Sequence, residues 1–247
     1  MTSETSRRDF LRMASLAGAT LLAGGNAAKA GAADAPGAAA AGAVAGLAAT
    51  PLTAKPLPLK LQRTTGISAG THEEHYKLYQ GYIKKTNEVL DRLKTVDLTT
   101  ANQSFSDLRS LKVDLTFALG GVKNHELYFD AMGGPGGPAG GALGARIARD
   151  FGSHEKWAAE FRACGLAARG WVWLAWDRDL ARMMNYIGDA QNTYPVWNSA
   201  VVLPMDVYEH AYYLDFKTNR AGYIDAFLAN VDWDAATKLA QTAGALS

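Results

Sequence analysis

Histidines and carboxylates are the side chains in this sequence best suited to redox or metal chemistry. Asp206 precedes His210 by four positions, so on a helix both would lie on one face, and at a strand-to-helix junction they could still converge. Imidazole and carboxylate groups together suit iron and other first-row metals. Spacing alone leaves a structural role open, because an isolated histidine is more often a core or surface residue. The chain has five histidines, at positions 72, 75, 125, 154 and 210.

Two long helical patterns precede the Asp206 segment. In residues 71–93, Thr71 and Glu74 form the pattern of a capping box, and apolar residues recur at helical spacing. A second helix is predicted over residues 104–131, interrupted or bent at Gly120-Gly121, and a Gly/Pro run at 133–138 ends it. We therefore expect an antiparallel α-hairpin domain over residues 60–132.

The second half of the chain mixes helical and strand patterns. Helices are predicted over residues 142–151 and 156–166, and short apolar or aromatic runs predict strands at 171–175, 180–187 and 201–207. A turn at residues 177–179 separates the first two strands. The expected fold is an N-terminal helical hairpin followed by an α+β domain, residues 142–247, with a small three-stranded antiparallel sheet.

The N-terminal sequence is typical of an export signal. Arg7 and Arg8 precede an apolar stretch, and Ala28-Lys29-Ala30 offers a cleavage motif, so residues 1–30 are predicted to be a twin-arginine signal peptide. This predicts a periplasmic or extracellular protein. Residues 31–59, rich in Ala, Gly and Pro, are predicted to be a flexible linker. A membrane span is not predicted in the mature chain.

The net charge and the cysteine content bear on nucleic-acid binding and on disulfide bonds. The formal net charge is +1, which gives no indication of nucleic-acid binding. The single cysteine, Cys164, allows no intrachain disulfide bond and is interpreted as a buried apolar residue.

Several segments resemble one family. Residues 206–213, Asp-Val-Tyr-Glu-His-Ala-Tyr-Tyr, resemble the D-V-W-E-H-A-Y-Y signature of iron/manganese superoxide dismutases, with Tyr208 in place of tryptophan. Residues 67–76 and 121–125 resemble the family segments that carry its first two ligand histidines, and the likeness covers roughly residues 60–245. It implies a site for one Mn or Fe ion in each subunit, with the ligands His75, His125, Asp206 and His210.

The resemblance also implies an activity. Such a protein converts superoxide to oxygen and hydrogen peroxide by alternate reduction and oxidation of its metal ion. The altered residues near the site leave open an exported metal-binding protein with the dismutase fold but little or no turnover. A metal-free structural or partner-binding protein would require all four ligand positions to be accidental.

Further residues are assigned by the same likeness. Gln191 matches the glutamine position typical of manganese enzymes, and Gly121 occupies the iron-type position, which favours manganese; Gln191 could also be an ordinary loop residue. Tyr82 resembles the gateway tyrosine, although it follows His75 by seven residues where the family usually has eight. Leu78 and Tyr79 occupy the region where the family has a second histidine.

The remaining assignments concern the aromatic wall and the partner subunit. Trp171 and Trp173 are expected in the aromatic wall of the site, where Phe129 replaces a tryptophan. Glu209 and Tyr213 match residues that reach the other subunit in family dimers, so a homodimer or a dimer of dimers is expected. His72 and His154 fall outside the pattern and are predicted to be solvated.

Overall fold

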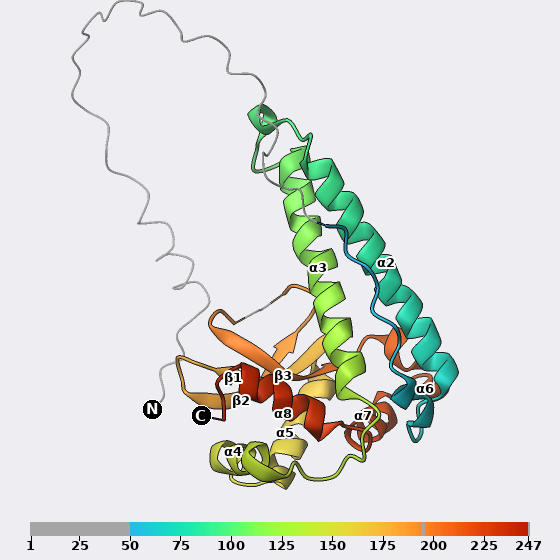
Figure 1. Cartoon of the computed structure of the whole chain (residues 1–247), viewed down its shortest axis with the longest axis vertical. Helices are drawn as coiled ribbons and strands as arrows, with labels where there is room; N and C mark the ends of the chain where they lie inside the picture. Colours follow the sequence, from blue (N-terminus) through green and yellow to red (C-terminus); the bar gives the residue numbers. More distant parts are fainter. Residues whose placement is uncertain (1–49, 194–195, 247) are drawn as a thin grey trace, which may run out of the picture. The chain divides into compact units, whose positions relative to one another are not determined.

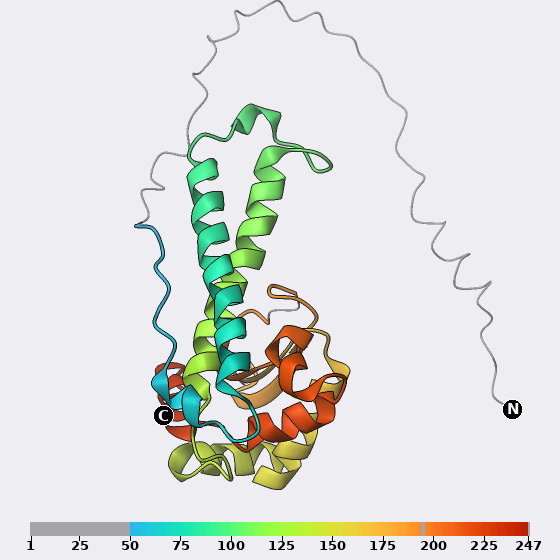
Figure 2. The same ribbon diagram turned by 90° about the vertical axis from the view of Figure 1, so that its right-hand side faces the viewer.

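The computed structural model describes residues 50–193 and 196–246, and it consists of a helical pair followed by an α+β part (Figure 1). The helices α2 (Ala69–Leu93) and α3 (Asp107–Ala131) pack side by side and antiparallel, joined through the short helix η2 (Leu98–Thr100) (Figure 2). The predicted fold class is therefore confirmed. The predicted signal peptide and the first part of the predicted linker lie outside the described residues.

The start of α2 differs from the prediction. Its N-cap is Ser68, whose extended backbone precedes the helix and whose side chain accepts a hydrogen bond from the backbone N–H of Thr71. The assignment of Thr71 as N-cap was wrong, because Thr71 already lies within the first turn. Its hydroxyl instead donates to Asp215, 2.7 Å away, and so ties α2 to the C-terminal part of the chain.

The second helix is not interrupted, since α3 runs without a break through Gly120 and Gly121. These glycines permit close packing. A Cβ atom at Gly121 would lie 2.7 Å from the ring of Tyr82, and one at Gly120 would lie 2.5 Å from the backbone oxygen of Gln191. Both contacts involve residues that the sequence places at the metal site.

The α+β part contains α4 (Gly141–Phe151), α5 (His154–Ala167) and the strands β1 (Trp171–Asp177), β2 (Arg182–Gly188) and β3 (Ser199–Asp206). The sheet is antiparallel with the order β2-β1-β3. Its central strand β1 is buried along its whole length, which explains its continuous aromatic and apolar sequence. In the register, Trp171 lies opposite Asp206, so the start of β1 meets the end of β3.

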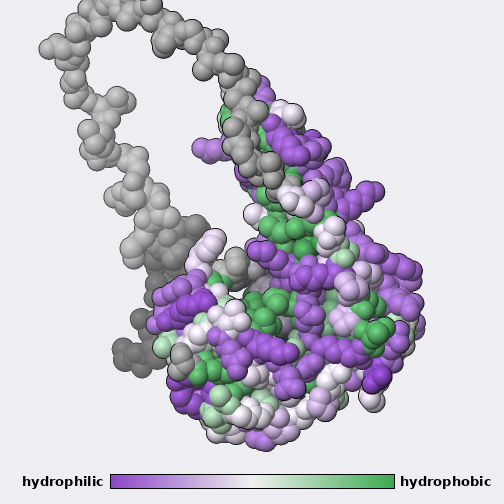
Figure 3. All heavy atoms as spheres, in the orientation of Figure 1, coloured by the Kyte–Doolittle hydropathy of each residue, from purple (hydrophilic) through white to green (hydrophobic). Residues whose placement is uncertain are grey.

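Short elements complete the described chain, and one core joins its two halves. Large buried side chains from α3, α5, β1 and α7 form this core; they include Tyr128, Trp157, Phe161, Trp171 and Phe227. On the face shown in Figure 3, hydrophilic residues cover most of the coloured surface, and hydrophobic residues lie between them in patches. None of the described helices is long and apolar enough to cross a membrane. The short elements are η1 (Leu59–Arg63), η3 (Glu209–Ala211), α6 (Tyr213–Phe216), α7 (Arg220–Leu228) and α8 (Trp233–Thr242).

Residues 52–58 form an extended segment along the helical pair, here called the N-terminal strap (Figure 1). The backbone N–H of Leu52 donates to Oδ1 of Asn87, and the backbone oxygen of Leu52 accepts from Nδ2 of Asn87, each at 2.8 Å. At Lys55, the N–H donates to the hydroxyl of Tyr79 and the carbonyl accepts from the hydroxyl of Tyr76. The prediction of a flexible linker was therefore wrong for these residues, because polar side chains of α2 satisfy their backbone.

Replacing Tyr79 by phenylalanine is expected to destabilise the fold by roughly 1–3 kcal/mol, because a buried network loses its central group. The Tyr79 hydroxyl accepts from Lys55 and donates to Glu126 on α3, 2.8 Å away, so it links the strap to both helices. Urea unfolding of Tyr79→Phe measures the loss. The matched variant Tyr76→Phe, which removes one hydrogen bond at a half-buried hydroxyl, should cost less; equal costs would contradict a bridging role for Tyr79.

Candidate metal site

The structure brings together the four side chains that the resemblance selects. His75 comes from α2, His125 from α3, Asp206 from the end of β3 and His210 from η3. Their potential ligand atoms all lie within 4.8 Å of one another. The first three side chains are fully buried, whereas the side chain of His210 keeps 27% of its surface exposed.

A single carboxylate oxygen is the centre of the cluster. The Oδ2 atom of Asp206 lies 3.1 Å from Nε2 of His75, 3.2 Å from Nε2 of His210 and 3.7 Å from Nε2 of His125. One oxygen cannot fully satisfy three imidazole nitrogens. The arrangement is therefore typical of donors that surround a cation.

A hydrogen bond at Nδ1 fixes the tautomer of His125. Nδ1 of His125 lies 2.7 Å from the carbonyl oxygen of Gly121, so Nδ1 carries the proton. The lone pair is then on Nε2, which is buried and has no hydrogen-bond partner within the described residues. A buried lone pair that faces two imidazoles and a carboxylate fits a metal ion.

Burial and mutual contact set the charges of the cluster. Burial lowers the pKa of His125 to about 3 and also lowers the pKa of His75, so both rings are neutral at physiological pH. Burial alone would raise the pKa of Asp206, but His210 and His75 outweigh it and hold that pKa well below its usual value. Neutral imidazoles with an ionised carboxylate are the forms in which these groups bind metal ions.

Backbone and phenol groups orient the carboxylate. The backbone N–H of Tyr208 donates to Oδ1 of Asp206 at 2.9 Å, which leaves Oδ2 directed at the histidines. The hydroxyl of Tyr223 donates to the carbonyl of the same aspartate at 2.6 Å, and it lies 3.2 Å from the hydroxyl of Tyr128. The ring of Tyr128 in turn packs against His75, with ring centroids 5.0 Å apart. Sequence reasoning did not identify either of these tyrosines.

Tyr82 reaches the site despite its shortened spacing from His75. The helix α2 is regular between them, so seven residues make nearly two full turns and leave both side chains on one face. The ring of Tyr82 lies 5.3 Å from that of His125, centroid to centroid. The ring can approach α3 this closely only because Gly121 has no side chain.

Gln191 lies in the loop after β2, but its side chain is buried beside the cluster, with 3% of the residue exposed. Its Oε1 accepts from Nε1 of Trp171 at 3.1 Å, and its Nε2 donates to the hydroxyl of Tyr82 at 3.2 Å. Trp171 also packs edge-on against His125, with a centroid distance of 5.4 Å. Gln191 is therefore held between two aromatic residues that border the four candidate ligands.

The two tryptophans expected in the aromatic wall, Trp171 and Trp173, have different hydrogen-bond partners. Nε1 of Trp173 donates to Oδ1 of Asn124 at 3.1 Å, and Nδ2 of Asn124 donates to the backbone oxygen of Gln191 at 3.2 Å. It is Trp171, two residues earlier on the same strand face, that contacts the cluster. Asn124, which precedes a candidate ligand, is a further residue that sequence reasoning missed; its position next to His125 was the available signal.

Glu209 and Tyr213 lie at the surface beside His210. The Glu209 side chain is exposed and makes no ion pair within the described residues, and Tyr213 and Leu214 are 45% and 52% exposed. Tyr213 has Lys217 over its ring, 5.6 Å from the centroid. Leu78, at the position where a histidine was expected, is 42% exposed.

The two remaining histidines were predicted to be solvated, but His72 is buried and His154 is half-buried. His72 is 1% exposed, and its Nε2 lies 2.9 Å from the hydroxyl oxygen of Thr64, because its position on α2 faces inward like that of His75. His154 is half-buried, and its ring packs against Trp157 and Trp233. Neither belongs to the four-residue cluster.

Because of His72, we expect the free energy of unfolding to decrease as the pH falls. Burial and the neighbouring His75 lower the pKa of His72 to about 4, although Asp215 acts in the opposite direction. Between this value and the ordinary 6.5, the unfolded chain binds a proton that the folded chain does not, so stability declines as the pH falls through this window. The maximal slope is about 1.4 kcal/mol per pH unit. Unfolding of wild type and His72→Leu at pH 7.5 and 5, at equal metal content, should show a shallower dependence for the variant; equal slopes would exclude this role.

Comparison with known proteins agrees with the geometry. Residues 58–133 match the alpha-hairpin domain of iron/manganese superoxide dismutases, and residues 138–239 match their C-terminal domain. The chain is 40% identical over 182 residues to a superoxide dismutase [Fe] of Aquifex aeolicus, which covers 71% of the chain and 85% of that protein. It is 37% identical over 188 residues to a superoxide dismutase [Fe] of Cupriavidus metallidurans, covering 74% and 92%. A superoxide dismutase [Mn] 1 of Halobacterium salinarum is 35% identical over 168 residues, covering 68% and 81%. The chain belongs to the iron/manganese superoxide dismutase family.

Proposed function

We propose that the chain dismutates superoxide at one iron or manganese ion held by His75, His125, Asp206 and His210. The observation that carries this proposal is the convergence of three imidazole nitrogens on Oδ2 of the aspartate, where the buried Nε2 of His125 has no hydrogen-bond partner among the described residues. The relatives named as superoxide dismutases, in iron and manganese forms, support the activity.

The reaction requires two one-electron steps and two protons. A bound iron or manganese ion supplies the one-electron redox chemistry, and in total two superoxide ions and two protons give oxygen and hydrogen peroxide. The protein holds the ligands in a buried, preorganised cluster that needs little rearrangement. A groove of about 430 Å³ between α2 and α3, lined in part by Leu78, Tyr82 and Phe117, offers a route for the small anion to reach the site.

Tyr82 and Gln191 are proposed to manage protons beside the metal. Burial, followed by the charge of Asp206, raises the pKa of Tyr82, so the phenol keeps its proton. Because the phenol oxygen accepts from the amide of Gln191, its own hydrogen remains available to donate to a bound anion. Gln191 cannot rotate freely, since Trp171 holds its other amide atom.

Manganese is the proposed metal on the basis of Gln191. This amide comes from the loop after β2, while Gly121 leaves no side chain on α3 at the alternative position. The relatives include proteins named for either metal. Elemental analysis of natively expressed protein tests the choice, and iron as the main metal would reject it.

A homodimer, alone or as a dimer of dimers, is proposed around His210. The exposed carboxylate of Glu209 and the exposed side chains of Tyr213 and Leu214 form one surface next to this partly exposed ligand. Sedimentation analysis should give the mass of at least two chains, and Glu209→Ala should weaken association. A monomer at micromolar concentration would contradict the proposal.

Export by the twin-arginine route is proposed from Arg7 and Arg8. Cell fractionation should find the wild-type protein outside the cytoplasm, in the periplasm or the medium. Replacement of both arginines by lysine keeps the charge and should retain the protein in the cytoplasm. Equal distribution of the two forms would argue against this route.

The activity itself is tested on the purified metal-loaded protein by the rate of superoxide removal. Rapid removal that depends on the bound metal is expected. The alternative, an exported metal-binding protein with little turnover, is not favoured, since Tyr82 and Gln191 both reach the ligand cluster. Stoichiometric iron or manganese without activity would favour that alternative.

A further inference from the structure

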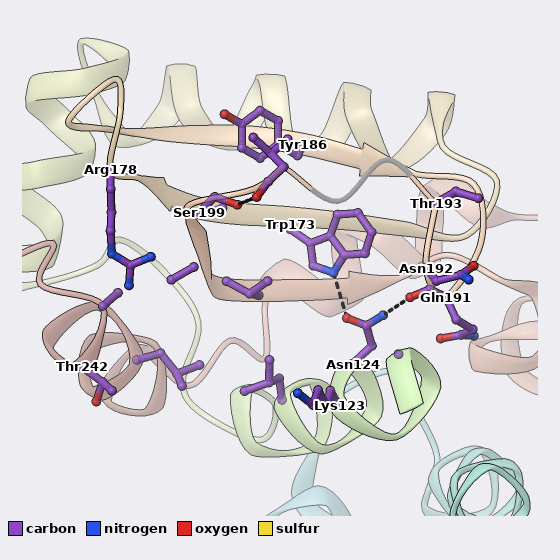
Figure 4. Close-up of a pocket in the computed structure, with 18 residues that line it drawn as sticks. Lys123, Asn124, Trp173, Arg178, Tyr186, Gln191, Asn192, Thr193, Ser199 and Thr242 are labelled. Carbon is purple, nitrogen blue, oxygen red and sulfur yellow. Dashed lines mark hydrogen bonds between the residues drawn. The ribbon is translucent and has the colours of Figure 1, made fainter. Parts of the chain in front are cut away.

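A second cavity is bordered by the loop that carries Gln191 (Figure 4). Its volume is about 560 Å³, and its walls come from α3, the three-stranded sheet and α8. This size is within the range of sites for small organic molecules, which measure roughly 300–1,000 Å³. The four candidate metal ligands do not line it.

The walls of this cavity combine apolar surface with positive charge. Trp173, Leu127 and Val201 supply aromatic and aliphatic surface, whereas Lys123 and Arg178 are the charged residues among those that line it. Aspartate and glutamate are absent from the described lining residues. The Lys123 ammonium makes no ion pair with the described residues. The Arg178 guanidinium donates to the backbone oxygen of Asn198 over 3.4 Å, which is a long hydrogen bond. Both cations thus retain donors for an anion.

The inner wall is fixed in place by hydrogen bonds. Figure 4 shows the indole of Trp173 bonded to Asn124, and Asn124 bonded in turn to the backbone of Gln191. Trp173 and Asn124 are each 8% exposed, so the surface that a ligand would meet is held by buried contacts. A preformed wall favours binding, because little side-chain freedom is lost when a ligand enters.

We propose that this cavity binds a small organic anion with an aromatic body, such as an aromatic carboxylate. The aromatic body would pack on Trp173 and Leu127. The carboxylate would form a charge-assisted hydrogen bond with Lys123 or Arg178, which lie at different edges of the cavity in Figure 4. The proposal does not depend on the metal or on turnover. Apart from Gln191, the described residues that line the cavity have no direct part in the proposed dismutase chemistry.

The probe is 2-naphthoate, with the isosteric neutral compound 2-naphthamide as comparison, titrated into the metal-loaded full-length protein by calorimetry. The acid should bind about tenfold or more tightly than the amide, since each charge-assisted hydrogen bond adds roughly 1.4 kcal/mol or more. The double variant Lys123→Gln/Arg178→Gln should remove this preference. The matched double variant Lys112→Gln/Arg63→Gln, with exposed cations outside the cavity, should keep it.

A cavity-filling variant locates the binding. Ala200 lies on β3 and lines the cavity, so Ala200→Phe should abolish binding of both compounds while leaving superoxide removal unchanged. Equal affinities of the acid and the amide for the wild type would overturn the proposal. So would binding that survives Ala200→Phe in a variant shown to be folded by circular dichroism, or absence of binding at millimolar probe.

Discussion

Replacing His125 by alanine is expected to abolish metal retention and to lower thermal stability at the same time. The ring lies at the junction of α3 and the sheet, and its unpartnered Nε2 faces the carboxylate of Asp206. A metal ion present at about a hundred times its Kd stabilises a protein by about 2.7 kcal/mol. At roughly 2–4 °C per kcal/mol for a chain of this size, the midpoint should fall by about 5–10 °C. Elemental analysis and calorimetry measure the two effects.

The metal-stripped proteins provide the control for His125→Ala. If the stability loss comes from the absent metal, the difference in midpoint between wild type and variant should shrink once both are stripped. A difference of equal size in the stripped proteins would indicate a packing defect only. Unchanged metal content in the variant would reject His125 as a ligand.

Gln191→Ala should leave metal content nearly intact while reducing superoxide removal by about 10–100-fold, the range typical of residues that position groups around a metal. The variant removes the acceptor for Trp171 and the donor to Tyr82 but no proposed ligand. Its effect should therefore appear in turnover and in the reduction potential of the metal. Rate measurements at equal metal loading, with a spectroelectrochemical titration, make this comparison.

The neighbouring amide offers a matched control. The side chain of Asn192 donates to the hydroxyl of Thr116 and has no bond to the site residues, so Asn192→Ala should retain nearly full activity. Trp171→Phe removes the indole donor while keeping an aromatic ring, and it should reproduce part of the Gln191 defect. Full activity in Gln191→Ala would place the functional amide elsewhere.

Much of the fold could be predicted because its signals are local. The Gly/Pro run ends α3, and the aromatic run of β1 indicates a strand buried on both faces. The predicted start of α2 was wrong, because two local signals compete there. Ser68 and Thr71 are both residue types that suit an N-cap. The structure places Ser68 there, and Asp215 accepts from both the backbone N–H of Ser68 and the hydroxyl of Thr71, a contact that no local pattern shows.

The convergence of the metal-site residues required the resemblance, since they are far apart in the sequence. Spacing alone left Asp206 and His210 ambiguous, and no local pattern relates either to His75. Tertiary context also explains the errors. His72 is buried because the helix face it shares with His75 packs inward. The glycines at positions 120 and 121 allow Gln191 and Tyr82 to pack closely against α3.

The strap has a consequence for any processing of the chain's N-terminal part. Its backbone is bonded to α2, which carries His75, and Lys55 pairs with Glu126, the residue after His125. Cleavage inside the strap would break these bonds and loosen the two helices that supply half of the proposed ligands. Any cut that preserves the site must therefore fall before Leu52, and trimming that proceeds to Pro58 should yield a chain that holds its metal less tightly.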